Sequence, residues 1–424
     1  MPLAQKLKTI LLWSLYLPIV GATYVVVWLD RKIQFRLPFP RHLAQLAEQQ
    51  DWCIEELKKS GTLPADAVIN NYKITPLNQE IIFRSNAGII EIAYTTNGEN
   101  KTLKCFAKFA PTMGTVWNKA VFNLQLNHIK EIYFNEHFVK ADESIPAPRV
   151  YVSKISVVTG HLCLITELMD GCMEYLETVY TSFPNHHLGL AVEGMATLHA
   201  AFWHSKEERM KHVLPIEENT ILLFDSMVAF SWSNEARKVL GQSWRHMNEY
   251  QTILHGDSRI GNMMFPKAAD TGRFVMIDWQ AVRKGRAVYD LAYFLVLSLL
   301  KEHRIAEEQN AIDAYYKHLV ANGVKDYTKE QLQEDYNHAC LCVLVLLSLP
   351  MLSGEVSAEG KAAQIFVWGM GVWRDRMVVK FSEFDYAWMA NRYQLTEEQS
   401  RQAVEEMLTV IEVRLKKIEL AKTT

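Results

Sequence analysis

The segment 253–280 constrains the fold of this chain more than any other part of its sequence. Two apolar runs that read as strands, ILHGDSRIGNMMF at 253–265 and RFVMIDWQ at 273–280, bracket a polar loop. The side chains that stand out against this apolar background are His255, Asp257, Asn262 and Asp278. Aspartates often only cap turns. Two carboxylates and an amide at these positions indicate a shared chemical centre instead.

The spacing of these residues indicates phosphoryl transfer. In that reaction one aspartate orients the acceptor hydroxyl and accepts its proton, while an asparagine and a second aspartate hold the metal ions on the ATP phosphates. Asp257-x4-Asn262 has the spacing of the protein-kinase catalytic loop, and Asp278 ends the following strand. We predict Asp257 as the catalytic base, Asn262 and Asp278 as Mg²⁺ ligands, and His255 as a brace of the catalytic loop.

The chain resembles the aminoglycoside phosphotransferase and choline kinase-like superfamily, most closely its ecdysteroid kinase-like branch. The resemblance extends over residues 65–385, and its motifs are HGD-x4-N at 255–262, DWQ at 278–280, YDLA at 289–292 and LHAAFW at 198–203. It implies a bilobal protein-kinase-like α+β fold, ATP and Mg²⁺ as cofactors, and phosphorylation of a hydroxyl group on a small molecule. We expect Asp290 to hold the catalytic loop through backbone hydrogen bonds, because a buried carboxylate must be satisfied.

The rest of the sequence fits two lobes. Residues 65–168 are predicted to form a small antiparallel-sheet lobe, with hairpin breaks at 86–88 and 97–100 and a helix within 120–138. Residues 169–424 are predicted to form a larger, mainly helical lobe, in which a capping-box pattern at Thr396 starts the last helix. Residues 36–64 read as a linker and the first helix of the folded body.

Lys108 is the predicted phosphate-contacting residue. It lies at the centre of the apolar strand CFAKF, where an unpaired ammonium would be costly and a phosphate partner would explain it. The resemblance makes it the lysine of the third strand and favours Glu131 over Glu136 as its partner. The alternatives are that Lys108 is a lysine on an edge strand facing water and that Glu131 is an ordinary exposed charge.

Two further binding elements are predicted by resemblance. The apolar run 164–169 is similar to the hinge between kinase lobes, so the backbone from Glu167 to Met169 is the expected adenine site. The phosphate-covering loop is expected at 85–88, although only one glycine is present there. Late aromatic residues would form an acceptor pocket for an apolar alcohol, a steroid-like compound or a quaternary amine, or else would simply pack in the core: Trp368, Trp373, Tyr386 and Trp388.

The N-terminal segment, residues 1–35, contains twenty consecutive uncharged residues from Ile10 to Leu29. A helix of this length spans roughly 30 Å, so the segment is predicted to be a transmembrane anchor. Basic residues are more numerous after the run than before it, which places the catalytic body in the cytosol. The alternatives are an uncleaved targeting segment or a helix packed on the body of a soluble cytoplasmic protein.

Composition narrows the remaining choices. A formal net charge of −3, with charges of both signs spread through the chain, argues against a nucleic-acid partner. The six cysteines show no metal-binding or disulfide spacing and are predicted to be reduced and buried. No Ala-Pro-Glu-like activation segment follows DWQ, which disfavours a protein acceptor. The sequence predicts a small-molecule kinase, and the alternative is a catalytically silent pseudokinase that serves as a membrane-tethered binding scaffold.

Overall fold

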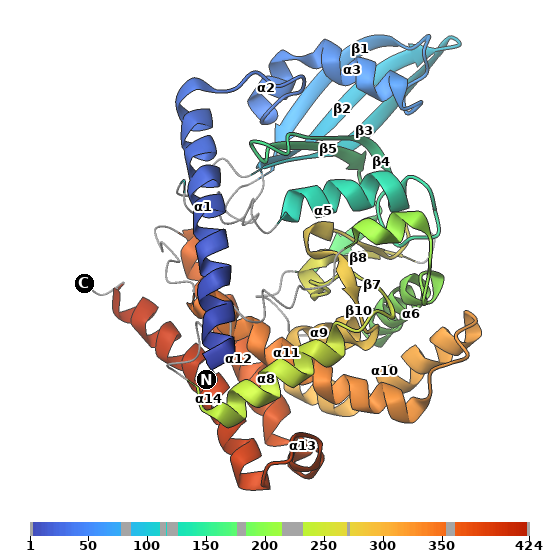
Figure 1. Cartoon of the computed structure of the whole chain (residues 1–424). Coiled ribbons are helices and arrows are strands. Elements are labelled where there is room, and N and C mark those ends of the chain that lie inside the picture. Colours follow the sequence, from blue (N-terminus) through green and yellow to red (C-terminus); the bar gives the residue numbers. More distant parts are fainter. Residues whose placement is uncertain are drawn as a thin grey trace. The chain divides into compact units, whose positions relative to one another are not determined.

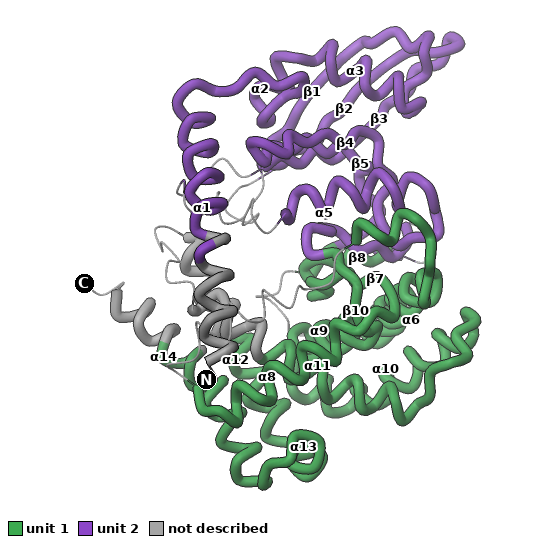
Figure 2. Tube along the Cα trace, viewed as in Figure 1, with its two compact units in different colours: residues 1–13, 174–266, 282–424 green, residues 14–173, 267–281 purple. Residues whose placement is uncertain are grey.

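The computed structural model describes residues 3–77, 86–110, 116, 126–175, 184–213, 232–268, 272–352 and 361–421. The chain divides into two compact units (Figure 2). We call residues 14–173 and 267–281 the N-lobe unit, and residues 1–13, 174–266 and 282–424 the C-lobe unit. The N-lobe unit contains the large sheet, and the C-lobe unit is mainly helical (Figure 1).

The N-lobe unit is built on a five-stranded antiparallel sheet with the order β1-β2-β3-β5-β4 (Figure 1). The strands are β1 (Val68–Pro76), β2 (Asn86–Thr96), β3 (Glu99–Phe109), β4 (Val150–Ile155) and β5 (Leu162–Glu167). The β2–β3 hairpin turns at Asn97 and Gly98, whose φ angles are 51° and 80°. Two successive positive φ angles are typical of a tight hairpin turn. The hairpin break predicted at 97–100 is therefore confirmed.

The break predicted at 86–88 is wrong. Asn86, Ala87 and Gly88 belong to β2 and pair with Phe109, Lys108 and Ala107 of β3. A side chain at Gly88 would come within 3.0 Å of Leu43, so this glycine permits close packing and does not form a loop. Of the phosphate-covering loop predicted at 85–88, position 85 lies outside the described residues, and the other three are strand.

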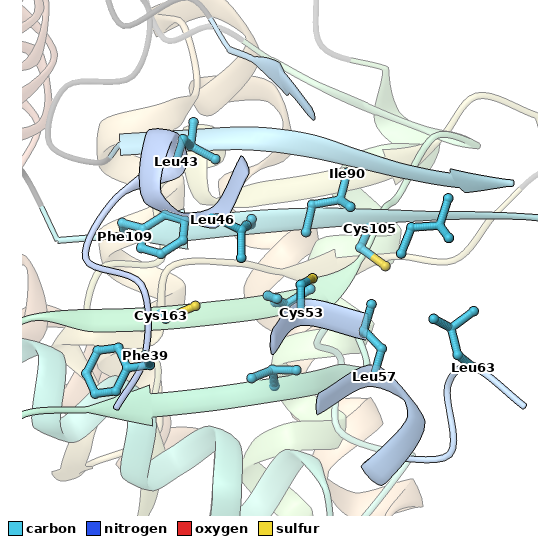
Figure 3. Packing of buried hydrophobic residues seen from close by; sticks show 14 of the residues in the cluster. Phe39, Leu43, Leu46, Cys53, Leu57, Leu63, Ile90, Cys105, Phe109 and Cys163 are labelled. Carbon is cyan, nitrogen blue, oxygen red and sulfur yellow. The ribbon is translucent and has the colours of Figure 1, made fainter. Parts of the chain in front are cut away.

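The sheet is covered on both faces. Helices α2 (Leu43–Glu48) and α3 (Gln50–Lys59) pack on one face, where their apolar side chains meet alternate residues of the strands (Figure 3). Helix α5 (Asn127–Phe134) covers Leu162 and Leu164 of β5 through Ile132, while Cys163 and Ile165 join the opposite core. Successive strand residues point to opposite faces, and both faces are covered, so β5 is apolar from Leu162 to Ile165. All six cysteines of the chain are free and buried, as predicted.

Several shorter elements complete the N-lobe unit. The predicted helix within 120–138 is observed as α5 and the π-helical η1 (Asn135–Val139), and residues 117–125 lie outside the described part. After the loop at 255–262, the chain contributes β9 (Val275–Met276) and the 3₁₀-helix η4 (Trp279–Ala281) to this unit. The Trp279 ring stacks on Phe134 of α5 at 4.3 Å between centroids, which ties this late segment to the lobe.

The C-lobe unit consists of helices around a short two-stranded ladder. The ladder pairs β7 (Thr252–Leu254) with β10 (Arg283–Gly285). The chain also forms β6 (Cys172–Glu174), β8 (Met263–Pro266), η2 (Glu208–His212) and η3 (Ile260–Asn262). The helices are α6 (Asn185–Ala201), α8 (Asn234–Met247), α9 (Val288–Ser298), α10 (Lys301–Ala321), α11 (Lys329–Leu352), α12 (Lys361–Ser382), α13 (Tyr386–Tyr393) and α14 (Glu397–Ala421).

Two helices of the C-lobe unit bear directly on the sequence predictions. The predicted capping box is present at the start of α14. The backbone N–H of Gln399 donates to Thr396 Oγ1 at 3.1 Å, and the backbone N–H of Thr396 donates to Gln399 Oε1 at 2.9 Å. Every residue of α9 is buried, so this helix forms the centre of the lobe. Together, the antiparallel sheet with α5 and the helical lobe form a bilobal kinase-like α+β fold, as predicted.

The transmembrane anchor predicted at the N-terminus is not supported. Among the residues that the structure describes, no helix is long and apolar enough to cross a membrane. The segment forms helix α1 (Leu3–Ile33), which continues past the apolar run into Asp30, Arg31 and Lys32. Its C-terminal turns contribute Val27 and Asp30, which are 1% and 3% exposed, to the N-lobe unit.

Asp30 attaches the end of α1 to the N-lobe unit. Its Oδ1 accepts a hydrogen bond from the guanidinium of Arg41, and its Oδ2 lies 2.8 Å from Nε2 of His161, between β4 and β5. Burial by itself raises the pKa of Asp30, but the hydrogen bonds and charges of His161 and Arg41 outweigh it, so the pKa lies below its usual value. Asp30 therefore stabilises the fold as a carboxylate.

We expect Asp30→Asn to lower the free energy of unfolding at pH 7 by about 2 kcal/mol, because it removes charge-assisted hydrogen bonds from a buried cluster. Urea denaturation measures the loss, with Asp51→Asn on the exposed side of α3 as the control. Since the folded pKa of Asp30 is depressed, its contribution is present above the unfolded pKa of ~3.9 and is lost as the pH falls through the folded value. Equal stability of the two variants at pH 7 would contradict the role of Asp30.

Candidate active site

The position of Lys108 follows from the alternation along β3. Cys105, Ala107 and Phe109 face the core under α2 and α3, so Lys108 must face the opposite side of the sheet. There it pairs in register with Leu164, which packs against Ile132 of α5. Lys108 is 8% exposed and therefore is not a lysine that faces water.

Lys108 is held between two carboxylates. Its Nζ lies 2.7 and 2.9 Å from the two oxygens of Glu131 on α5, and 2.7 Å from Oδ1 of Asp278. Glu131 is 2% exposed, whereas Glu136 forms a surface ion pair with Lys140. The structure thus brings together Lys108, Glu131 and Asp278, and it places Glu136 elsewhere.

The charges of this trio favour a bound cation. Burial by itself lowers the pKa of Lys108, but the charges of Asp278 and Glu131 outweigh it and hold the pKa above its usual value. The ammonium therefore stays protonated beside two carboxylates, and the trio has one negative charge in excess when both are ionised. Burial raises the pKa of Glu131 above its usual value, and the charge of Asp278 adds to this effect, so ionising Glu131 here is unfavourable without a further positive partner. An excess negative charge in a buried cluster is stabilised by a metal cation or by further hydrogen-bond donors.

Asp278 has the backbone of a specialised residue. Its φ angle is 64°, in the left-handed region that few residues other than glycine adopt. Asp278 was predicted to end a strand, but β9 ends two residues earlier, at Met276, and Asp278 lies in the turn between β9 and η4. Its Oδ2 accepts a hydrogen bond from Gln280 Nε2 at 3.1 Å, while its side chain remains 26% exposed. One carboxylate that keeps contact with solvent suits Mg²⁺, which usually takes one or two protein oxygens together with waters and phosphates.

The second cluster of predicted residues lies on the loop after β7, in the C-lobe unit. The side-chain amide of Asn262 donates to the backbone oxygen of Asp257 at 2.8 Å and to its Oδ2 at 2.9 Å. These bonds use the amide nitrogen of Asn262, so its oxygen is the atom suited to a hard metal ion. Among the residues that the structure describes, no group of three or more His, Cys, Asp or Glu side chains could hold a metal by itself.

Two residues that the sequence did not single out also contact Asp257. The hydroxyl of Tyr293, on α9, donates to Asp257 Oδ1 at 2.9 Å. Burial raises the pKa of Tyr293 well above its usual value, and the charge of Asp257 adds to the effect, so the hydroxyl remains a donor. Arg259 Nε lies 3.3 Å from Asp257 Oδ1 and forms the third contact.

Helix α9 braces the loop along its length. Oδ2 of Asp290 accepts the backbone N–H of His255 at 2.6 Å, and its Oδ1 accepts that of Gly256 at 2.9 Å. The Ser258 hydroxyl donates to the backbone oxygen of Asp290, and the Ile260 amide donates to the Ser298 hydroxyl. The expectation that Asp290 holds the loop by backbone hydrogen bonds is confirmed.

His199 extends this brace to other helices. Its Nε2 lies 3.2 Å from Asp290 Oδ2, and its Nδ1 lies 2.6 Å from the hydroxyl of Tyr315 on α10. All three side chains are fully buried. His199 belongs to the LHAAFW motif, so the sequence offered a signal for it, although the motif did not indicate which residue it contacts.

His255 is a brace by its position. It is fully buried, and its Nδ1 accepts the backbone N–H of Asp257 at 3.3 Å. This geometry agrees with the supporting role predicted from the sequence, and its contribution to catalysis stays a prediction.

The predicted hinge lies at the end of β5. Glu167 is the last residue of that strand. Its carboxylate forms an ion pair with Arg273 at 2.8 Å and accepts a hydrogen bond from the backbone N–H of Arg149 at 3.2 Å. The side chain of Glu167 is therefore engaged within the N-lobe unit. Its backbone N–H donates to the Arg149 oxygen at 2.9 Å, so a nucleotide base at this residue would bind the backbone oxygen, which also accepts the Thr166 hydroxyl at 3.3 Å. Met169 is buried, and its carbonyl accepts the Cys172 amide.

The late aromatic residues were predicted either to line an acceptor pocket or to pack in the core. Tyr386 is buried and Trp388 lies beside Phe384 and Tyr393, which is ordinary packing among α13 and its neighbours. Trp373 is half-buried in α12, and the side chain of Trp368 lies outside the described part. The described contacts of Tyr386 and Trp388 favour core packing, so an aromatic acceptor pocket stays a prediction.

Comparisons with known proteins agree with the motifs. Residues 173–325 match the model of the Ecdysteroid kinase-like family. No curated protein matches the chain. Choline kinase from Cryptosporidium parvum is a similar solved structure, 11% identical with a TM-score of 0.47, and the match covers 78% of this chain and 95% of that one.

Two other solved structures show similar values. Ethanolamine kinase from Plasmodium vivax is 13% identical with a TM-score of 0.44, and the match covers 72% of this chain and 81% of that one. An aminoglycoside phosphotransferase in a ternary complex with streptomycin and ATP is 13% identical with a TM-score of 0.40, over 76% and 95%. The matched segment contains the braced loop with Asp257 and Asn262, together with Asp278 and α9. Over residues 173–325, the chain is similar to the ecdysteroid kinase-like family.

Proposed function

We propose that the protein transfers the γ-phosphoryl group of ATP to a hydroxyl group of a small molecule. The observation that carries the proposal is that Lys108, buried in the sheet lobe, is paired with both Glu131 and Asp278. A lysine in this setting is the group that kinases use on nucleotide phosphates. The loop with Asp257 and Asn262, braced by a buried helix, supports the same reaction.

Each residue has a role in this proposal. Lys108 contacts the ATP phosphates, and Glu131 keeps its ammonium in place. Asn262 and Asp278 offer the oxygen atoms that would hold Mg²⁺, which when bound neutralises charge on the phosphates. The backbone from Glu167 to Met169 receives the adenine base.

Asp257 acts on the acceptor. Its carboxylate orients the acceptor hydroxyl and takes its proton as the oxygen forms a bond to the γ-phosphorus and the bond from that phosphorus to ADP breaks. The products are ADP and the phosphate ester, and the proton leaves Asp257 for solvent. The family name makes ecdysteroids and other apolar alcohols the first acceptors to screen.

The proposal is tested by supplying γ-labelled ATP and Mg²⁺ with metabolite extracts and a panel of steroid and amine alcohols. We expect the wild-type protein to label at least one compound. Lys108→Met should lower kcat/KM on the order of 100-fold, because it removes a preorganised positive charge from the phosphates. Lys104→Met is the matched control, since Lys104 lies on the same strand and is exposed.

Two results would count against the kinase proposal. If Lys108→Met labelled the product as fast as Lys104→Met, the buried lysine would have no part in phosphoryl transfer. If the wild-type protein consumed no ATP and bound none in the presence of Mg²⁺, the alternative of a catalytically silent binding scaffold would be favoured instead.

A further inference from the structure

Tyr293 is a buried polar group whose position the phosphotransferase motifs do not explain. It lies on α9, three residues after Asp290, so both side chains point from the same side of the helix toward the loop. Asp290 holds the backbone of the loop, and the Tyr293 hydroxyl lies 2.9 Å from the Asp257 carboxylate. Tyr293 is 5% exposed and therefore has little freedom to leave this position.

The carboxylate of Asp257 is held on both oxygens by separate elements. Oδ1 accepts from Tyr293 on α9, and Oδ2 accepts from Asn262 in η3. A carboxylate that is held by one donor can rotate about the bond to its carbon chain. Fixing both oxygens sets the plane of the group and directs the remaining lone pairs, which decides where an acceptor hydroxyl can approach.

We propose that Tyr293 is a positioning residue for phosphoryl transfer, which acts by fixing the orientation of the Asp257 carboxylate. The proposal rests on the kinase function proposed above. Arg259 also contacts the carboxylate, but its side chain is 27% exposed and lies two residues away on the same loop. Tyr293 comes from a buried helix, so it is the contact that links the carboxylate to the rigid centre of the lobe.

Helix α9 provides a matched control one turn earlier. Tyr289 is fully buried, like Tyr293, and the polar side chain that interacts with it is Arg283, not Asp257. Tyr289→Phe and Tyr293→Phe therefore remove the same atom from the same helix, and only the second removes a contact with Asp257.

The test measures Mg²⁺-dependent ATP turnover with water as the acceptor, using the full chain. We expect Tyr293→Phe to lower kcat about tenfold, as loss of a hydrogen bond to a charged group does, with the KM for MgATP unchanged. Tyr289→Phe should match the wild type in both constants. Thermal denaturation of the two variants should give midpoints that agree closely, which excludes a folding defect as the cause.

A double variant separates positioning from a general structural effect. If Tyr293 acts through Asp257, Tyr293→Phe should cause no further loss when Asp257 is already asparagine. A further tenfold loss in the double variant, an equal loss in Tyr289→Phe, or a wild-type kcat in Tyr293→Phe would each overturn the role of Tyr293. A wild-type protein that neither turns over nor binds MgATP, or turnover that is unchanged in Asp257→Asn, would instead overturn the proposed kinase function, and the role of Tyr293 with it.

Discussion

Asp257→Asn is expected to lower kcat on the order of 10³-fold, with MgATP affinity within about threefold of the wild type. The amide has nearly the shape of the carboxylate. Its single oxygen can still accept the hydrogen bond from Asn262, while its NH2 group can donate to the hydroxyl of Tyr293. It cannot accept a proton from the acceptor hydroxyl. The loss should therefore fall on the chemical step, while the nucleotide continues to bind.

Two measurements check this result. ADP release in a coupled assay gives kcat, and isothermal titration with MgATP gives the affinity. Asp313→Asn, which removes a carboxylate from the exposed surface of α10, is the control. An Asp257→Asn variant that retains more than a tenth of wild-type turnover would show that Asp257 does not accept the proton.

Asp290→Ala is expected to have the largest effect on stability, a loss of about 3–5 kcal/mol in the free energy of unfolding. The change leaves the backbone N–H groups of His255 and Gly256, and the ring of His199, buried without their acceptor. Burial by itself raises the pKa of Asp290, but the hydrogen bond and charge of His199 outweigh it, so the pKa lies below its usual value. The contribution of Asp290 is therefore present at neutral pH and is lost as the pH falls through the folded pKa.

A second buried aspartate separates stability from catalysis. Asp335 is 2% exposed and pairs with Arg286 and His246 in the same unit, but it does not contact the loop. Asp335→Ala should also lose stability, while kcat per folded molecule stays at the wild-type level. Asp290→Ala should lose kcat as well, because the loop that carries Asp257 loses its attachment to α9. If the two variants had equal kcat per folded molecule, the brace would not matter for the reaction.

The prediction of the loop residues relied on local sequence. The three residues of this prediction lie within about 20 positions of one another: Asp257, Asn262 and Asp278. Their spacing and the flanking strands therefore form one local motif. A partner for Lys108 could also be predicted, because a charge in the middle of an apolar strand is costly unless it is paired. The choice of Glu131 over Glu136 relied on the resemblance, and the ion pair of Glu131 with Lys108 agrees with it.

The hairpins show where a local signal was misleading. Asn-Ala-Gly at 86–88 and Asn-Gly at 97–98 contain the same turn-forming residue types. Only the second has positive φ angles at both positions, and the first continues β2 because Gly88 packs against Leu43 of another element. The distinction depends on a neighbour 45 positions away along the chain, which no short window contains.

The sequence by itself determined the residue types on which the proposed phosphoryl transfer depends, since these are set by short-range spacing and by strand alternation. The tertiary structure alone decided which side chains contact these residues and how the N-terminal helix is attached to the N-lobe unit. Tyr293 reaches Asp257 across 36 positions, and Asp30 is buried because His161, 131 positions away, lies beside it. Such contacts depend on how whole elements pack, and the free energy of burying a polar group is set by partners that adjacent residues do not reveal.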